Sequence, residues 1–117
     1  MKGYYQLIEG HGGGFMFALR AGNHETILES RVFWSRQAAL DAVQAARENS
    51  QDTTRFVRRQ APDGMQFFEL VDAEGRLLGR SFACATRAGV NAGIASVQRN
   101  APATQFRGLV RRALSFG

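Results

Sequence analysis

Apolar and polar residues alternate in short runs through the first half of the chain. Phe15, Phe17 and Leu19 occupy every second position and therefore share one face of an extended segment. The runs 4–8, 15–20 and 26–30 predict three strands separated by turns. Residues 36–49 predict a helix, because Ser35 is a good N-cap residue and helix-forming residues follow it. The first half thus reads as three strands and one helix.

The second half repeats this pattern 51 residues later without a gap. Identical residues stand at both positions of several aligned pairs, among them Gly13/Gly64, Phe17/Phe68, Leu19/Leu70, Ser30/Ser81, Arg36/Arg87 and Asn49/Asn100. Self-similarity at a fixed spacing is typical of a duplication. We therefore expect residues 1–117 to form a single domain of two tandem repeats, at about 3–58 and 54–112.

The second helix is predicted over 87–100, with Thr86 as its cap. Val90, Ile94 and Val97 form a stripe that should cover the sheet. Beside it runs a stripe of small residues, Gly89, Gly93 and Ser96. Each glycine inside a helix costs about 1 kcal/mol relative to alanine, so we expect this stripe to mark close packing against another backbone.

The glycine-rich stretch 10–14 has two interpretations, a hairpin turn or a ligand-binding loop. The repeat aligns it with Ala61-Pro62-Asp63-Gly64-Met65, in which Pro, Asp and Gly each favour a turn. A phosphate-binding loop would be followed by a helix, whereas "FMFALR" reads as a strand. The pattern favours the turn.

Residues 104–114 are ambiguous. Their alignment with the strand-like run 53–59 predicts a final strand over 104–111. However, Phe106, Leu109, Val110, Ala113 and Leu114 also have the spacing of an amphipathic helix.

Two pairs of segments resemble the YegP-like proteins, a bacterial family of duplicated domains of unknown function. They are "LRAGNHETILES" with "SRQAALDAVQAARENS", and "LVDAEGRLLGRS" with "TRAGVNAGIASVQRNA". His24 departs from the pattern, since glycine is usual there. The resemblance implies an α+β fold in which two β-β-β-α-β units build one antiparallel sheet, exchange their last strands and pack both helices on one face. It implies no activity and no catalytic residues.

The few cysteines and histidines limit the kinds of functional site that this chain can form. Cys84 is the only cysteine and His11 and His24 the only histidines, which excludes an intrachain disulfide and favours neither a metal site nor a cofactor. No nucleophile, base and orienting group are close in sequence, so we expect no enzymatic activity. The chain shows neither a signal-peptide pattern nor an apolar run of membrane-spanning length, and we expect a cytoplasmic protein.

Charge gives the strongest hint of function. The net charge is +5, and all of the excess lies in residues 51–117, with ten basic and five acidic residues. Six arginines belong to the two segments equated as final strands: Arg55, Arg58, Arg59, Arg107, Arg111 and Arg112. If strand exchange brings them together, they form a surface for nucleic acid or another polyanion. The alternative is that these arginines are merely solvated and protect sheet edges from aggregation.

Trp34 suggests a second class of function. It aligns with Ala85, so the symmetric core does not require a large side chain at this position. Tryptophan is enriched at the centres of protein interfaces. The alternative to polyanion binding is therefore a protein-interaction or self-associating module that uses sheet edges and Trp34, while Trp34 could also be an ordinary packing residue.

Overall fold

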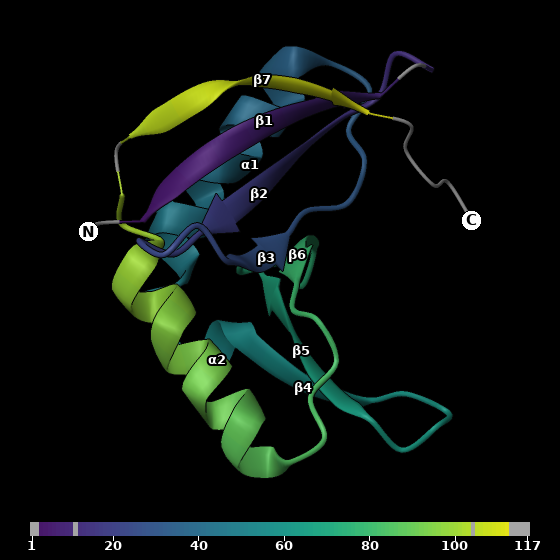
Figure 1. Ribbon diagram of the computed structural model, residues 1–117, viewed down its shortest axis with the longest axis vertical. Coiled ribbons are helices and arrows are strands. Elements are labelled where there is room, and N and C mark those ends of the chain that lie inside the picture. The colour runs from purple at the N-terminus through teal and green to yellow at the C-terminus, as the bar shows by residue number, and fades with distance from the viewer. Residues whose placement is uncertain (1–2, 11, 104, 113–117) are drawn as a thin grey trace.

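The computed structural model describes residues 3–10, 12–103 and 105–112. It contains the expected elements in the expected order (Figure 1). They are β1 (Tyr4–Gly10), β2 (Phe15–Arg20), β3 (Thr26–Glu29), α1 (Arg36–Asn49), β4 (Phe56–Gln60), β5 (Gln66–Val71), β6 (Leu77–Arg80), α2 (Arg87–Asn100) and β7 (Phe106–Arg112). A short 3₁₀ helix, Thr53–Arg55, precedes β4. It takes the place of the predicted start of that strand because the Asp52 carboxylate accepts from the Thr54 N–H at 2.9 Å.

One seven-stranded sheet carries both repeats, in the order β4-β5-β6-β3-β2-β1-β7. The last strands are exchanged as expected: β4 pairs with β5 of the second repeat, and β7 pairs with β1 of the first. The α+β architecture is therefore confirmed, with one correction. The sheet is mixed, because β7 runs parallel to β1 whereas every other pair is antiparallel.

The direction of β7 follows from where α2 ends. The Tyr5 hydroxyl donates to the Ala101 carbonyl at 2.7 Å, just after the helix. The chain then enters the sheet beside the start of β1, where the Tyr5 N–H donates to the Gln105 carbonyl at 3.0 Å. A strand that begins beside the start of its neighbour must run parallel to it. The strand interpretation of 104–114 is thus confirmed for 106–112, while residues 104, 113 and 114 lie outside the described residues.

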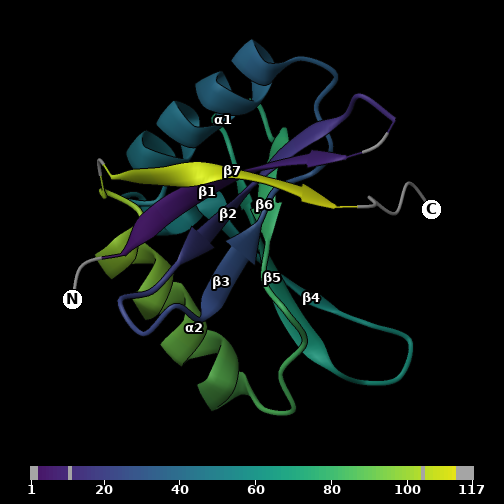
Figure 2. The same cartoon turned by 45° about the horizontal axis from the view of Figure 1, so that its top comes forward.

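Both helices cover the same face of the sheet (Figure 2). The core between them combines alternate residues of the central strands, such as Phe17, Leu19 and Leu70, with Val43 of α1 and Val97 of α2. These five side chains are fully buried. On the other face of β1 and β2, Ile8, Met16 and Ala18 form a smaller buried cluster.

The duplication extends to individual hydrogen bonds. The Ser30 hydroxyl accepts from the Phe17 N–H, and the Ser81 hydroxyl accepts from the Phe68 N–H, both at 2.9 Å. The helix caps also correspond, with Ser35 accepting from the Ala38 N–H and Thr86 from the Gly89 N–H. Both helices end with the same contact, in which the amide of Asn49 or Asn100 donates to the carbonyl four residues before it at 2.8 Å.

The glycine-rich stretch is a hairpin turn between β1 and β2. Gly13 and its counterpart Gly64 have φ values of +84° and +87°, and each donates to the carbonyl three residues earlier. The same comparison shows why glycine is usual at the position of His24. The φ of His24 is +70°, and its counterpart Gly75 has a φ of +80°. Glycine is favoured at such positions because it adopts positive φ without steric cost.

The stripe of small residues does permit close packing, but the neighbour is a side chain rather than a backbone. A Cβ on Gly93 would lie 2.8 Å from Cε1 of Phe68 in β5. A Cβ on Gly89 would lie 3.3 Å from Cβ of Cys84. The glycines let α2 approach the Phe68 ring and the segment that leads into the helix.

Candidate polyanion-binding surface

The six predicted arginines do not form one patch. Arg55, Arg58 and Arg59 lie in or just before β4, whereas Arg107, Arg111 and Arg112 lie in β7. These strands are the two opposite edges of the sheet, and Figure 1 shows β7 at the top of the molecule and β4 near the bottom. The expectation that strand exchange brings the two sets together is therefore wrong. Exchange carries each final strand to the outside of the other repeat, and the whole sheet separates them.

On the β4 side, Arg58 reaches the helix α2. Arg58 Nη2 donates to Asn91 Oδ1 of α2 at 2.6 Å. Arg87 stands one turn before Asn91 on the same helix and is exposed. Residues four apart share a helix face, so Arg87 lies on the side of α2 that meets Arg58.

On the opposite face of β4, two arginines meet around one carboxylate. Arg59 Nε lies 2.9 Å from Glu69 Oε1, and Arg80 Nη2 lies 2.7 Å from Glu69 Oε2. The Glu69 side chain is 11% exposed, whereas those of Arg59 and Arg80 are each 55% exposed. One carboxylate thus positions two guanidinium groups and leaves both accessible to solvent.

The ionisation of Glu69 follows from these contacts. Burial works to raise the pKa of its carboxyl group, but hydrogen bonds from Arg80 and Arg59 outweigh burial, and the pKa lies below its ordinary value. The carboxylate stays charged at neutral pH. Two arginines on one carboxylate leave a net positive charge at this point of the sheet.

A hollow of about 360 Å³ lies at the β4–β5 hairpin. It is lined by Arg58, Arg59, Gln60 and Gln66, all of which carry N–H donors. Arg55 adds a further guanidinium before the strand, 3.6 Å from the Asp52 carboxylate. We call Arg55, Arg58, Arg59, Arg80 and Arg87 the β4 arginine group; with Asp52 and Glu69, it is a net cationic surface.

Arg80 and Arg87 were not among the six predicted arginines. Arg80 pairs with Glu69 across β5 and β6, and this pairing depends on strand register rather than on sequence distance. Arg87 stands out in the sequence only as the repeat partner of Arg36. Both belong to the second-half charge excess, which is the one signal that includes them.

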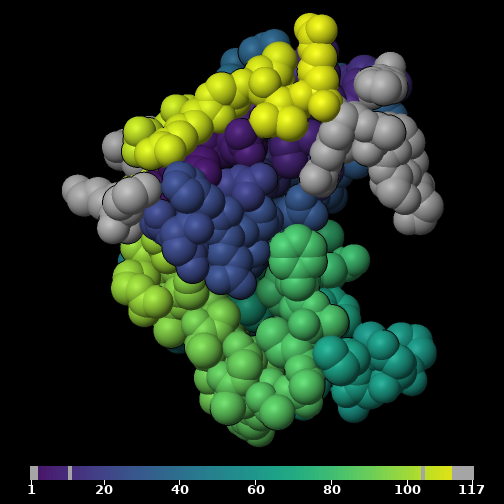
Figure 3. All heavy atoms as spheres, viewed as in Figure 1, coloured from purple at the N-terminus to yellow at the C-terminus, as the bar shows by residue number. Residues whose placement is uncertain are grey.

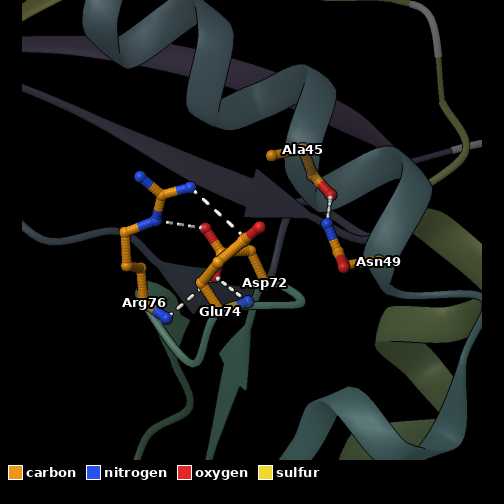
Figure 4. A network of polar contacts seen from close by, with 5 residues as sticks. All are labelled: Ala45, Asn49, Asp72, Glu74 and Arg76. Atoms are coloured by element: carbon orange, nitrogen blue, oxygen red, sulfur yellow. Dashed lines mark hydrogen bonds and ion pairs between the residues drawn. The ribbon is translucent and has the colours of Figure 1, made fainter.

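Arg76 belongs to a different structure although it is close to Arg80 in sequence. Its guanidinium lies 2.8 Å from the Asp72 carboxylate and 3.3 Å from the Glu74 carboxylate, within the turn between β5 and β6. Figure 4 shows the three side chains and their contacts. Burial works to raise the pKa of Asp72, but hydrogen bonds from Arg76 and Glu74 lower it overall. Arg76 stabilises this turn and is not part of the β4 arginine group.

The β7 arginines are dispersed around their own strand. The Arg107 guanidinium lies 4.4 Å from the centre of the Tyr4 ring, and Arg111 Nε lies 3.1 Å from Glu9 Oε2. Arg112 ends the strand opposite Gly10, and its side chain is outside the described part of the structure. Trp34 lies just before α1 and is 67% exposed.

The four phenylalanines of β2 and β5 do not form an exposed stacking platform. Phe17 and Phe68 are buried in the core, and Phe15 packs against it. Phe67 is half-buried on the other face, where the Arg80 guanidinium lies 5.4 Å from its ring centre. Phe17 and Phe68 are therefore core residues.

The repeats also differ in how they fill the space beside the helix. Phe33 is buried in the first repeat, whereas its counterpart Cys84 is only half-buried. A second hollow of about 360 Å³ lies there, lined in part by Ile27, Phe82, Cys84 and Gly89.

The described residues contain no group of three or more His, Cys, Asp or Glu side chains that could hold a metal ion. Neither described helix is long and apolar enough to cross a membrane.

Comparison with known proteins agrees with the fold and the duplication. The model of a domain of unknown function, DUF1508, matches the chain twice in tandem, at residues 11–56 and 57–107. A UPF0339 protein of Bordetella pertussis is 39% identical over 102 residues, which cover 87% of this chain and 91% of that protein. The UPF0339 protein YegP of Escherichia coli is 35% identical over 100 residues, covering 86% and 91%.

Two solved structures have the same fold. The solution NMR structure of E. coli YegP, described as a protein of unknown function, superimposes with a TM-score of 0.86 at 31% identity and covers 98% of this chain and 97% of that one. The NMR structure of a UPF0339 protein from Shewanella oneidensis gives a TM-score of 0.87 at 28% identity and covers 95% and 93%. This chain therefore belongs to the UPF0339 family of tandem DUF1508 domains, of which YegP is a member.

Proposed function

We propose that this protein is a non-catalytic, cytoplasmic binding domain whose β4 edge binds nucleic acid or another phosphate-rich polyanion. One observation supports the proposal: Arg58 and Arg59 of β4 line a hollow together with the amide donors Gln60 and Gln66, and Glu69 holds Arg80 of β6 beside Arg59. Guanidinium groups present several N–H donors in a planar fork, which suits phosphate oxygens.

The arrangement supports a polyanion rather than a single small anion. Arg58 and Arg59 lie on opposite faces of an edge strand, because Arg58 pairs with Phe68 and Arg59 with Phe67. A compact anion in the hollow would contact Arg58 and Arg59 but none of the arginines outside its lining, whereas a chain of phosphates can extend from the hollow toward Arg55, Arg80 and Arg87. Such a surface recognises the backbone of a nucleic acid and not its sequence.

The test is fluorescence anisotropy with labelled single-stranded and duplex oligonucleotides at about 50 and about 200 mM salt. The variant Arg58→Ala/Arg59→Ala removes two charges from the hollow. Arg31→Ala/Arg99→Ala is the matched control, because it removes two exposed arginines outside the β4 arginine group and lowers the net charge equally.

Each phosphate contact contributes about 0.7 to 0.9 to the slope of log affinity against log salt. We expect salt-dependent binding by the wild-type protein, and a slope about 1.5 units shallower in Arg58→Ala/Arg59→Ala. The control variant should keep most of the wild-type slope. Absence of binding at low salt, or an equal loss in both variants, would contradict the proposal.

A further inference from the structure

The two edges of the sheet differ in their apolar exposure. β7 has no neighbouring strand on its outer side among the described residues. Phe106, Leu109 and Val110 of this strand are 38%, 37% and 38% exposed, and they make up three of the five large exposed hydrophobic residues in the described structure. Figure 3 shows β7 in yellow along the upper rim, with its outer side uncovered. No large exposed hydrophobic residue lies in β4.

A β-bulge precedes Leu109 and Val110, and these two residues lie on opposite faces of the strand. Tyr5 pairs with Phe106 but Leu7 pairs with Leu109, so β7 holds one extra residue over this interval. Gly108 adopts a φ of +55° within it, as is common in bulges. Leu109 then lies on the face of Leu7 and the helices, and Val110 lies on the opposite face with Ile8. Apolar surface therefore wraps around the edge.

The strand is anchored to the rest of the fold on its inner side. The rings of Tyr5 and Phe106 lie 6.0 Å apart, and the Arg47 guanidinium is 5.2 Å and 5.9 Å from their centres. Arg47 also donates to the Ala103 carbonyl at 2.8 Å, just before the strand. An edge held in this way is organised before a partner arrives, which lowers the entropic cost of binding.

The positive charge of β7 favours an acidic partner strand over a second copy of this chain. β7 contains Arg107, Arg111 and Arg112 and no acidic residue. A second copy of the chain would bring its own three arginines to the same narrow strip, and like charges facing each other between strands are destabilising. A partner strand with carboxylates beside these arginines would neutralise their charge, and apolar residues beside Leu109 and Val110 would cover the exposed apolar surface.

We propose that β7 binds an extended peptide segment as an eighth strand, and that the segment has two adjacent apolar residues flanked by acidic residues. Backbone hydrogen bonds to the free edge supply affinity, and the side chains supply selectivity. The proposal does not rest on the β4 arginine group, which lies at the other edge of the sheet.

The experiment titrates the ¹⁵N-labelled full chain with blocked synthetic peptides and follows the amide shifts by NMR. The probes are Glu-Glu-Val-Val-Ser-Glu-Val, which matches β7 in antiparallel pairing, and its reversed sequence, which matches it in parallel pairing. One control peptide has lysine in place of each glutamate. A second has proline in place of the central valines, because proline removes backbone donors.

We expect shift changes concentrated in residues 106–112 and the neighbouring β1, with a dissociation constant of about 0.1 mM or tighter for one of the two acidic probes. Both control peptides should bind at least about tenfold more weakly. The variant Val110→Glu, which changes an exposed side chain, should abolish binding, whereas Arg58→Ala/Arg59→Ala should bind the peptide normally.

Three results would overturn this inference. The first is absence of shifts in 106–112 at about 1 mM peptide for both acidic probes. The second is shifts confined to the β4 arginine group, which would show that the peptide acts only as a polyanion. The third is a stable dimer by analytical ultracentrifugation that Val110→Glu dissociates, which would assign the β7 edge to a second copy.

Discussion

Replacing Gly93 with alanine tests whether packing or helix propensity determines stability at this position of α2. The new Cβ would lie 2.8 Å from Cε1 of Phe68, inside the roughly 3.5–4.0 Å at which carbon atoms attract each other. Phe68 is 1% exposed, and its ring packs edge-on against Phe56 with the ring centres 5.7 Å apart. The ring has little room to withdraw, so the helix and the sheet must separate locally.

Two opposing effects set the size of the change. Alanine should gain about 1 kcal/mol over glycine inside a helix. Inserting a methyl group into a filled core should cost about 1–3 kcal/mol. The difference predicts a net loss of about 1 kcal/mol in the free energy of unfolding. For a chain of 117 residues, this corresponds to a fall in Tm of about 4 °C.

Gly89→Ala is the matched control on the same helix. Its new Cβ would lie 3.3 Å from Cys84 Cβ and 3.4 Å from Thr86 Oγ1. Cys84 is half-buried beside a hollow and can shift. The tight contacts should therefore offset only part of the gain in helix propensity, and this variant should be more stable by a few tenths of a kcal/mol. Both variants are compared with the wild type by thermal and urea unfolding followed by circular dichroism.

A rise in Tm for Gly93→Ala that equals the rise for Gly89→Ala would refute the reasoning. A double-mutant cycle with Phe68→Leu gives an independent measure, because it isolates the interaction between the new methyl group and the ring. If the ring causes the loss, Gly93→Ala should be neutral or stabilising in the Phe68→Leu background.

Three further predictions concern the turns, the core and the charged surface. Gly75→Ala should lower the free energy of unfolding by about 1 kcal/mol because φ is +80° there, and Gly75→Asn should lower it less; equal losses in urea unfolding would argue against backbone strain. Burial raises the pKa of Tyr5 above its ordinary value, with the Arg47 charge as a partial offset. The unfolded chain therefore releases this proton first, and stability should fall as the pH rises above about 10. In Tyr5→Phe, the free energy of unfolding should fall less steeply at alkaline pH and should be about 1 kcal/mol lower at neutral pH, because the hydrogen bond to Ala101 is lost; an unchanged alkaline decline in stability would contradict this assignment. Glu69→Gln should strengthen oligonucleotide binding several-fold and steepen its salt dependence, because it frees Arg59 and Arg80; weaker binding by a folded variant would contradict the proposed surface.

Local chemistry made the elements predictable. The cap residues Ser35 and Thr86 marked where both helices begin, and each side chain accepts the expected backbone hydrogen bond. The alternation at Phe15, Phe17 and Leu19 identified one face of β2, with Phe17 and Leu19 fully buried. The ungapped repeat carried these assignments into the second half, where the glycines offered weaker signals of their own.

Relations between distant segments were not predictable in the same way. The sequence equated 53–59 with 104–111, and this similarity suggested that their arginines would meet. Sheet order depends instead on which strand edges pair with each other, and it places β4 and β7 at opposite ends. The Glu69 contacts to Arg59 and Arg80 and the bulge at Gly108 depend on register, which the repeat does not encode.

The two edges of the sheet differ in how their strands are paired. The strands β1-β2-β3 and β4-β5-β6 form equivalent units that meet between β3 and β6. β4 has two roles, since it follows α1 and also begins the second repeat. β7 follows α2 in the same way, but it pairs with β1 in parallel rather than within a hairpin. As a result, β4 is paired within a hairpin and presents arginines, whereas β7 is a lone parallel strand that presents apolar residues. Each proposed binding surface lies at one of the two positions where the symmetry of the repeats is broken.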